Sequence, residues 1–256
     1  MVASIVEALL RQIPSSEVAG IYFKGSAQKR WDSPVDYVPE VSDVDIHVLL
    51  RDDEHVARRL GEIESALAIQ SQIEAGYRSK VVSPVHTPRP QLVVLNHLLA
   101  DPEYSPSPRE TVTTLYGDDY PDASYDESRE RELARARLLS CSDVLEHLPL
   151  RVVDKPGRHL LVVLRDLTWR VSPAGPRLLS ILGVPSPQAW SLNRTQVISA
   201  LEEMEQRDLA KAYADFYLSG WAYFLSDFQD SAAPRAALGA AIEVLRRSAA
   251  AAAEAS

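Results

Sequence analysis

Short apolar and alternating stretches punctuate the first half of the chain, and their length and period are typical of β-strands. They predict strands at residues 18–23, 41–50, 89–96 and 110–117. The last of these ends in Leu115-Tyr116-Gly117 and is expected at an edge of the sheet. Residues 80–85 fit either a further strand or an extended arm.

Helical spacing appears twice in the same half, at residues 4–13 and 54–77. Ser4 is the expected N-cap of the first helix, and Pro14 ends it. Asp52 or Asp53 is the expected N-cap of the second helix.

From about residue 124 the chain becomes helical in pattern throughout. Pro173 is expected to stop the helix predicted at residues 157–171, and Thr195 is expected to cap the helix predicted at residues 195–207. Aromatic residues recur at helical spacing in the helix predicted at residues 210–229, which is typical of a bundle core. Helices are predicted at residues 128–147, 157–171, 178–182, 195–207, 210–229 and 236–253.

The two patterns together predict an α+β fold. A small mixed sheet with packed helices should form residues 1–123, and an all-α bundle of about five helices should form residues 124–256.

Composition narrows the class of protein. The chain has 256 residues, 46% of them hydrophobic, and a net charge of −9, which argues against extended contact with nucleic acid. The single Cys141 excludes an internal disulfide and fits a reducing cytoplasm. No stretch approaches the roughly 20 apolar residues of a membrane span. The N-terminus also lacks a basic start and a cleavage site. We therefore expect a cytoplasmic protein with no membrane partner; its oligomeric state is left open.

The segment Ser42-Asp43-Val44-Asp45-Ile46-His47-Val48 carries the strongest chemical signal. On a strand, Asp43 and Asp45 point to one face, where their like charges repel. A hard divalent cation such as Mg²⁺ relieves that repulsion and prefers oxygen ligands. Upstream, Gly25-Ser26 follows an apolar run and forms a turn whose backbone N–H groups suit a phosphate.

Gly25, Ser26, Asp43 and Asp45 together resemble the motif of the nucleotidyltransferase superfamily. That superfamily includes DNA polymerase beta, kanamycin nucleotidyltransferase and the aminoglycoside adenylyltransferases. Its pattern is an apolar strand, Gly-Ser or Gly-Gly, a spacer, then Asp-x-Asp or Asp-x-Glu on the next strand. The spacer here is longer than usual, and residues 31–39 look like an insertion. The alternative interpretation is a surface pair of aspartates beside an ordinary turn.

The resemblance implies a Mg²⁺-dependent nucleotidyltransferase. Asp43 and Asp45 would be catalytic metal ligands, while Gly25, Ser26 and Ser42 would hold a nucleoside triphosphate. A nucleoside monophosphate would pass to a hydroxyl of an acceptor. That acceptor could be an aminoglycoside-like molecule, another metabolite or a macromolecule.

The third strand departs from the family pattern. Members normally carry a third acid there, and the residue of this chain that looks equivalent is Gln91. A glutamine can ligate a metal through its carbonyl oxygen, but it cannot accept a proton at neutral pH. Asp101 and Glu103, just past the strand, are candidates for the missing base or are simply solvated loop carboxylates. The alternative function is therefore a degenerate nucleotidyltransferase that binds a nucleotide or a partner without catalysis.

The helical half of similar two-domain enzymes binds the acceptor and reaches the nucleotide phosphates with a basic residue. Four basic residues are candidates for that role, and ion pairing within the bundle explains them nearly as well. They are Lys155, Arg158, Arg165 and Arg194.

Overall fold

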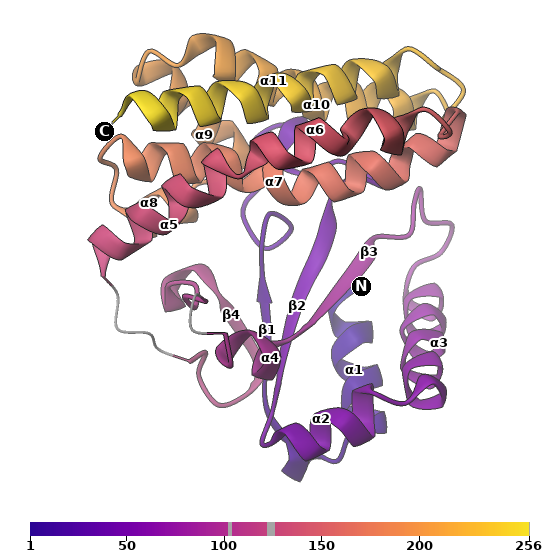
Figure 1. Ribbon diagram of the computed structural model, residues 1–256. Coiled ribbons are helices and arrows are strands. Elements are labelled where there is room, and N and C mark those ends of the chain that lie inside the picture. Colours follow the sequence, from indigo (N-terminus) through magenta and orange to yellow (C-terminus); the bar gives the residue numbers. More distant parts are fainter. Residues whose placement is uncertain (102–103, 122–125, 256) are drawn as a thin grey trace. The chain divides into compact units, whose positions relative to one another are not determined.

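The computed structural model describes residues 1–101, 104–121 and 126–255, and it shows an α+β protein (Figure 1). The chain divides into two compact units. The first comprises Met1–Gln28 and Asp43–Ser124, and the second comprises Lys29–Ser42 and Tyr125–Ser256. The predicted boundary between residues 123 and 124 lies outside the described residues. The sequence analysis did not anticipate that residues 29–42 belong to the helical unit.

A four-stranded mixed sheet forms the centre of the first unit. The strands lie in the order β3-β2-β1-β4, so the last strand is at an edge as expected. β1 runs antiparallel to β2 and β4, whereas β2 and β3 are parallel. The strands are β1 (Val18–Lys24), β2 (Asp43–Leu50), β3 (Arg89–Val94) and β4 (Thr113–Gly117).

Helices accompany this sheet, and several differ from the prediction. Their bounds are α1 (Val2–Gln12), α2 (Asp53–Leu60), α3 (Ile63–Lys80) and α4 (Leu95–Leu99), with short 3-10 turns at Ser15–Glu17 and Arg109–Thr111. The helix predicted at 54–77 is broken at Gly61, and its N-cap is Asp52, which accepts a hydrogen bond from the His55 N–H at 2.7 Å. Ser4 is buried inside α1 and does not cap it. Residues 81–85 form no strand.

The alternation along β2 separates a core face from a polar face. Val44, Ile46 and Val48 pack with apolar side chains of α1 and α3, which lie on one side of the sheet (Figure 1). Asp43, Asp45 and His47 point to the other side because side chains alternate along a strand. β2 therefore presents its ionisable residues on one face of the sheet.

The second unit is helical. It contains α5 (Glu127–Leu139), α6 (Cys141–Val152), α7 (Leu160–Ile181), α8 (Ser186–Ser191), α9 (Arg194–Glu203), α10 (Arg207–Leu225) and α11 (Ala233–Glu254), with 3-10 turns at Pro34–Asp36 and Gly157–His159. Of the aromatic side chains predicted to lie in the bundle core, Tyr213, Phe216 and Tyr217 are buried. Cys141 is also buried and free.

Pro173 does not stop a helix, contrary to expectation. Both Pro173 and Pro176 lie inside α7. A proline lacks the N–H that would bond the carbonyl four residues earlier, so Pro176 leaves the Ser172 carbonyl without its helical donor. The Tyr213 hydroxyl donates a hydrogen bond to that carbonyl at 2.8 Å. A neighbouring helix thus satisfies the group that the proline releases.

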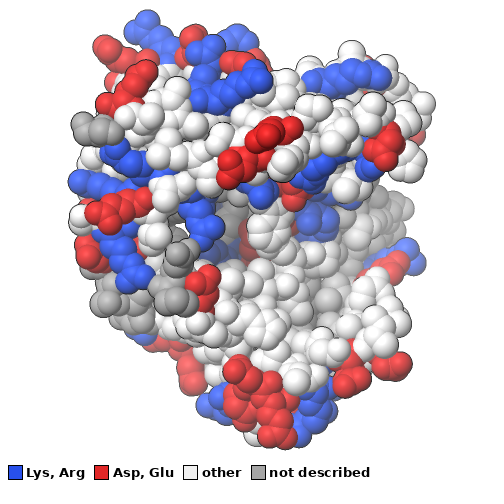
Figure 2. Space-filling view, in the orientation of Figure 1, with Lys and Arg blue, Asp and Glu red and all other residues white. Residues whose placement is uncertain are grey.

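Basic and acidic side chains are mixed over the helices of the second unit (Figure 2). In the described part of the chain, no helix combines the length and apolar character needed to cross a bilayer.

Candidate functional site

The carboxylate pair opens β2. Asp43 is buried and Asp45 is partly exposed on the polar face of the sheet. In the parallel register, Arg89 of β3 lies beside Asp43, and Gln91 lies beside Asp45. Arg89 and Gln91 are two residues apart and so share a face of β3. Two strands therefore bring a pair of carboxylates against an arginine and a glutamine.

Gln91 bridges the two carboxylates. Its amide is assigned with nitrogen toward them, because the opposite orientation would set its oxygen against acceptors only. The nitrogen then donates to Asp45 Oδ1 at 3.1 Å and to Asp43 Oδ2 at 2.6 Å. The predicted position of Gln91 on the carboxylate face is confirmed. One small polar group already touches both acids, so a small cation at the same place would also reach both.

Two cations from neighbouring strands flank the acids. The Arg89 Nη2 atom donates to Asp43 Oδ2 at 2.9 Å. Lys24 of β1 lies beside Asp45 in the antiparallel register and donates to the Ser107 hydroxyl. Burial lowers the pKa of Lys24, and the negative charge of Asp45 opposes that shift. The repulsion expected between Asp43 and Asp45 is therefore offset by side chains of the protein itself.

The Gly25 turn lies directly against Asp45. Gly25 has a φ of +83°, and a Cβ atom there would meet Asp45 Oδ2 at 1.9 Å. Only glycine avoids both the strained conformation and the collision. The two parts of the predicted motif are thus in contact, which the long spacer between them did not guarantee.

His47 continues the polar face beyond Asp45. Its Nδ1 atom lies 3.3 Å from the Tyr120 hydroxyl, which lies 3.0 Å from that of Tyr104. Burial lowers the pKa of His47 to about 3, and the charge of Lys24 adds to the shift. The imidazole is therefore neutral and a poor proton acceptor. Sequence reasoning did not single out His47, although its place two residues after Asp45 was a signal for it.

In the described structure, Asp101 does not replace the third acid. Asp101 follows α4, beyond the carboxyl end of β3, whereas Gln91 lies near the amino end of that strand. Glu103 lies outside the described residues. Among the residues that the structure describes, no group of three or more His, Cys, Asp or Glu side chains is arranged to hold a metal.

The Ser42 hydroxyl makes its hydrogen bonds within the second unit. Ser42 is fully buried there, and its hydroxyl accepts hydrogen bonds from Arg194 Nη1 at 2.9 Å and from the Val38 N–H at 3.0 Å. A fully buried hydroxyl is not accessible to a nucleotide. We therefore remove Ser42 from the candidate nucleotide-binding residues.

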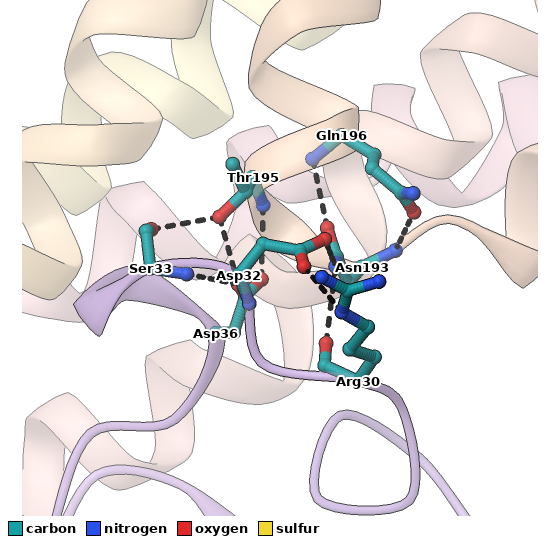
Figure 3. Close-up of polar contacts among 7 residues, drawn as sticks. All are labelled: Arg30, Asp32, Ser33, Asp36, Asn193, Thr195 and Gln196. Atoms are coloured by element: carbon teal, nitrogen blue, oxygen red, sulfur yellow. Dashed lines mark hydrogen bonds and ion pairs between the residues drawn. The ribbon is translucent and has the colours of Figure 1, made fainter.

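Residues 29–42, the segment between the two halves of the motif, pack into the helical unit. Val35, Val38 and Val41 are buried in its core. The Asp36 carboxylate is buried and accepts from the N–H groups of Asp32, Ser33 and Thr195 and from the Thr195 hydroxyl, at 2.7 to 2.9 Å (Figure 3). The long spacer is therefore a docked segment of the second unit.

The same network defines the start of α9. Asn193, and not Thr195 as predicted, is the N-cap and forms a capping box with Gln196 (Figure 3). The Asn193 Nδ2 atom donates to the Arg30 carbonyl at 3.0 Å and to Asp32 Oδ2 at 2.6 Å. Thr195 points instead to Asp36. The capping residues of one helix thus hold residues 30–36 in place.

The basic residues proposed for phosphate binding have other partners. Arg194 donates to the carbonyls of Val35 and Asp36 and stacks 4.0 Å from the Tyr217 ring. Arg165 donates to the carbonyl and carboxylate of Glu40. Lys155 pairs with Asp154, and Arg158 lies 3.9 Å from Asp227. Arg165 and Arg194 therefore stabilise the docked segment.

Comparison with models of protein families, with curated proteins and with solved structures gave no match.

Proposed function

We propose that this chain is a Mg²⁺-dependent nucleotidyltransferase. One observation carries the proposal: a single nitrogen bridges Asp43 and Asp45 immediately beside the Gly25 turn. A group of that size can be replaced by a metal ion that prefers oxygen ligands. The motif resemblance adds to this geometry.

The residues that would hold Mg²⁺ are Asp43 and Asp45, with Gln91 as a third oxygen donor once its amide turns over. The ion, when bound, neutralises the phosphate charge and the departing pyrophosphate. Gly25 and Ser26 would hold the phosphates through the turn at the end of β1. The acceptor hydroxyl would displace pyrophosphate from the α-phosphorus and receive the nucleoside monophosphate.

The alternative is nucleotide binding without transfer, and the site offers a specific reason for it. Gln91 cannot serve as a base, and Arg89 and Lys24 already balance the two carboxylates. Such a protein would bind nucleotide as a regulatory or partner-binding module.

A transfer assay separates the two functions. The protein is incubated with each common nucleoside triphosphate labelled at the α-phosphate, together with candidate acceptors such as aminoglycosides. We expect label on an acceptor with Mg²⁺ and none with chelator or in Asp45→Asn. Metal-dependent binding without any transfer would favour the alternative. Transfer that persists in Asp45→Asn would contradict the proposed metal site.

A further inference from the structure

Among the described residues, the Arg89 guanidinium uses only part of its hydrogen-bonding capacity. Its Nη2 atom donates to Asp43, while its Nε atom is buried and has no hydrogen-bond partner in the described part of the chain. A buried donor without an acceptor is costly, so such groups usually have a ligand or water as a partner. The side chain as a whole is 29% exposed, so its guanidinium remains within reach of a ligand.

We propose that Arg89 is a phosphate-binding residue of this site, held on Asp43 until a metal–polyphosphate complex arrives. This inference rests on the proposed function, because it assumes that the carboxylate pair receives the phosphates of a nucleotide. It assigns to β3 a role in binding phosphate that the Gly25-Ser26 turn alone was expected to fill.

The chemistry of the side chain favours a phosphate over another carboxylate. A guanidinium carries five N–H donors in a planar fork that matches two oxygens of a phosphate. Asp43 occupies one nitrogen only. A phosphate oxygen would supply an acceptor for Nε and would bring negative charge to a site where two cations already converge.

Metal binding explains why Arg89 would leave Asp43 for a phosphate. An ion held by Asp43 and Asp45 would neutralise the carboxylate that holds Arg89, so the Arg89–Asp43 ion pair would weaken. A metal held by Asp43 would compete with Arg89 and Gln91, which both donate to the Asp43 carboxylate. Arg89 then exchanges a carboxylate partner for a phosphate partner, and its positive charge stays in the site.

Inorganic tripolyphosphate tests the inference without knowledge of the base or the acceptor. Its affinity for the full chain is measured by calorimetry with Mg²⁺ for wild type, Arg89→Gln, Arg89→Lys and the control Arg78→Gln. Arg78 pairs with Glu74 on α3 and does not touch the carboxylate site. Mn²⁺ affinity is measured in parallel by electron paramagnetic resonance, and thermal melts check folding.

We expect Arg89→Gln to weaken tripolyphosphate binding by about 10- to 100-fold, as for a lost charge-assisted hydrogen bond. Arg89→Lys keeps the charge but not the fork, so it should lose less. Mn²⁺ affinity should not weaken in Arg89→Gln, because a competing counter-ion is gone. Arg78→Gln should behave as wild type.

The outcomes separate this inference from the proposed function. If wild type binds tripolyphosphate only with Mg²⁺, and folded Arg89→Gln and Arg89→Lys bind it equally well, the role of Arg89 is wrong and the metal site stands. If wild type binds no tripolyphosphate with Mg²⁺, both proposals fall. Tripolyphosphate binding that depends on Arg89 but needs no metal would support the phosphate-binding role of Arg89 and contradict the metal site.

Discussion

At the scale of single residues, Gln91 joins Arg89 in donating hydrogen bonds to the carboxylate pair. Its amide donates to both Asp43 and Asp45, where a third acid would repel them. The position of Gln91 followed from the strand register and could be predicted. The hydrogen bonds could not, because the orientation of an amide depends on the groups around it.

Gln91→Glu should therefore make folding stability depend on metal. Without metal, we expect a loss of about 1–3 kcal/mol, because two hydrogen bonds vanish and three like charges meet. Mg²⁺ should restore the lost stability by binding three carboxylates more tightly than two. Thermal melts with Mg²⁺ and with chelator measure this dependence.

Gln188→Glu, on an exposed position of α8, is the control. Equal melting of Gln91→Glu in both conditions would count against a metal site.

Gly25 is the second residue that decides the geometry. Gly25→Ala combines a positive φ with a Cβ atom 1.9 Å from Asp45 Oδ2. We expect a loss of about 1–3 kcal/mol of stability and weaker metal binding, because Asp45 must move. Gly239→Ala is a matched control, since a Cβ atom there meets nothing within 4 Å. Chemical denaturation and Mn²⁺ titration report the two effects. Wild-type metal affinity in folded Gly25→Ala would contradict this placement of Asp45.

At the scale of elements, the sequence predicted strands better than helix ends. Apolar alternation along β2 is a local property, so it was visible without the fold. The continuation of α7 through Pro176 depends on a hydroxyl from α10, which no local pattern can reveal. Likewise, the docking of residues 29–42 depends on Arg194 and Thr195, more than 150 positions away in the chain. Val35 and Val38 lie in the stretch at residues 31–39 that looked like an insertion, and Val41 was predicted to begin a strand.

The buried carboxylate of Asp36 should give this docked segment a dependence on pH. Burial alone would raise the pKa of Asp36, but hydrogen bonds from Thr195, Ser33 and Asp32 outweigh it and the pKa is lowered. The stabilisation is therefore present above the unfolded pKa of about 4 and is lost as the pH falls through the folded value.

Asp36→Asn tests this element directly. We expect a loss of about 2–3 kcal/mol at neutral pH, because a charged acceptor of several hydrogen bonds is replaced. The loss should stay constant between about pH 7 and pH 4 and shrink as the pH falls below about 4. The free energy of unfolding across this range measures both. Asp215→Asn, at a partly exposed ion pair with Lys211, should show neither effect. A constant difference at all pH values would contradict the assigned charge state.

At the scale of the whole molecule, the chain passes between its two units within the proposed nucleotide-binding motif. Residues 29–42 belong to the helical unit, while Gly25 and Asp43 on either side of them belong to the sheet unit. The helical unit is therefore incomplete without a segment that comes from the first quarter of the chain.

A fragment beginning at residue 126 should consequently be unstable. It lacks Val35, Val38 and Val41, which are buried in the core of the helical unit. We expect a synthetic peptide of residues 29–42 to bind this fragment and raise its melting temperature. A peptide carrying Val38→Asp should not, because it buries a charge. A fragment that melts as high as the intact unit without any peptide would show that the segment is dispensable.

Metal-dependent nucleotide binding tests the central claim most directly. Calorimetric titration of the full chain with each common nucleoside triphosphate is repeated with Mg²⁺, with chelator and in Asp43→Asn and Asp45→Asn. We predict binding of at least one nucleotide with Mg²⁺, and its loss with chelator and in both folded variants, because two carboxylates must share the ion. Equal affinity with and without Mg²⁺, or unchanged binding in the variants, would contradict a magnesium–nucleotide site at Asp43 and Asp45.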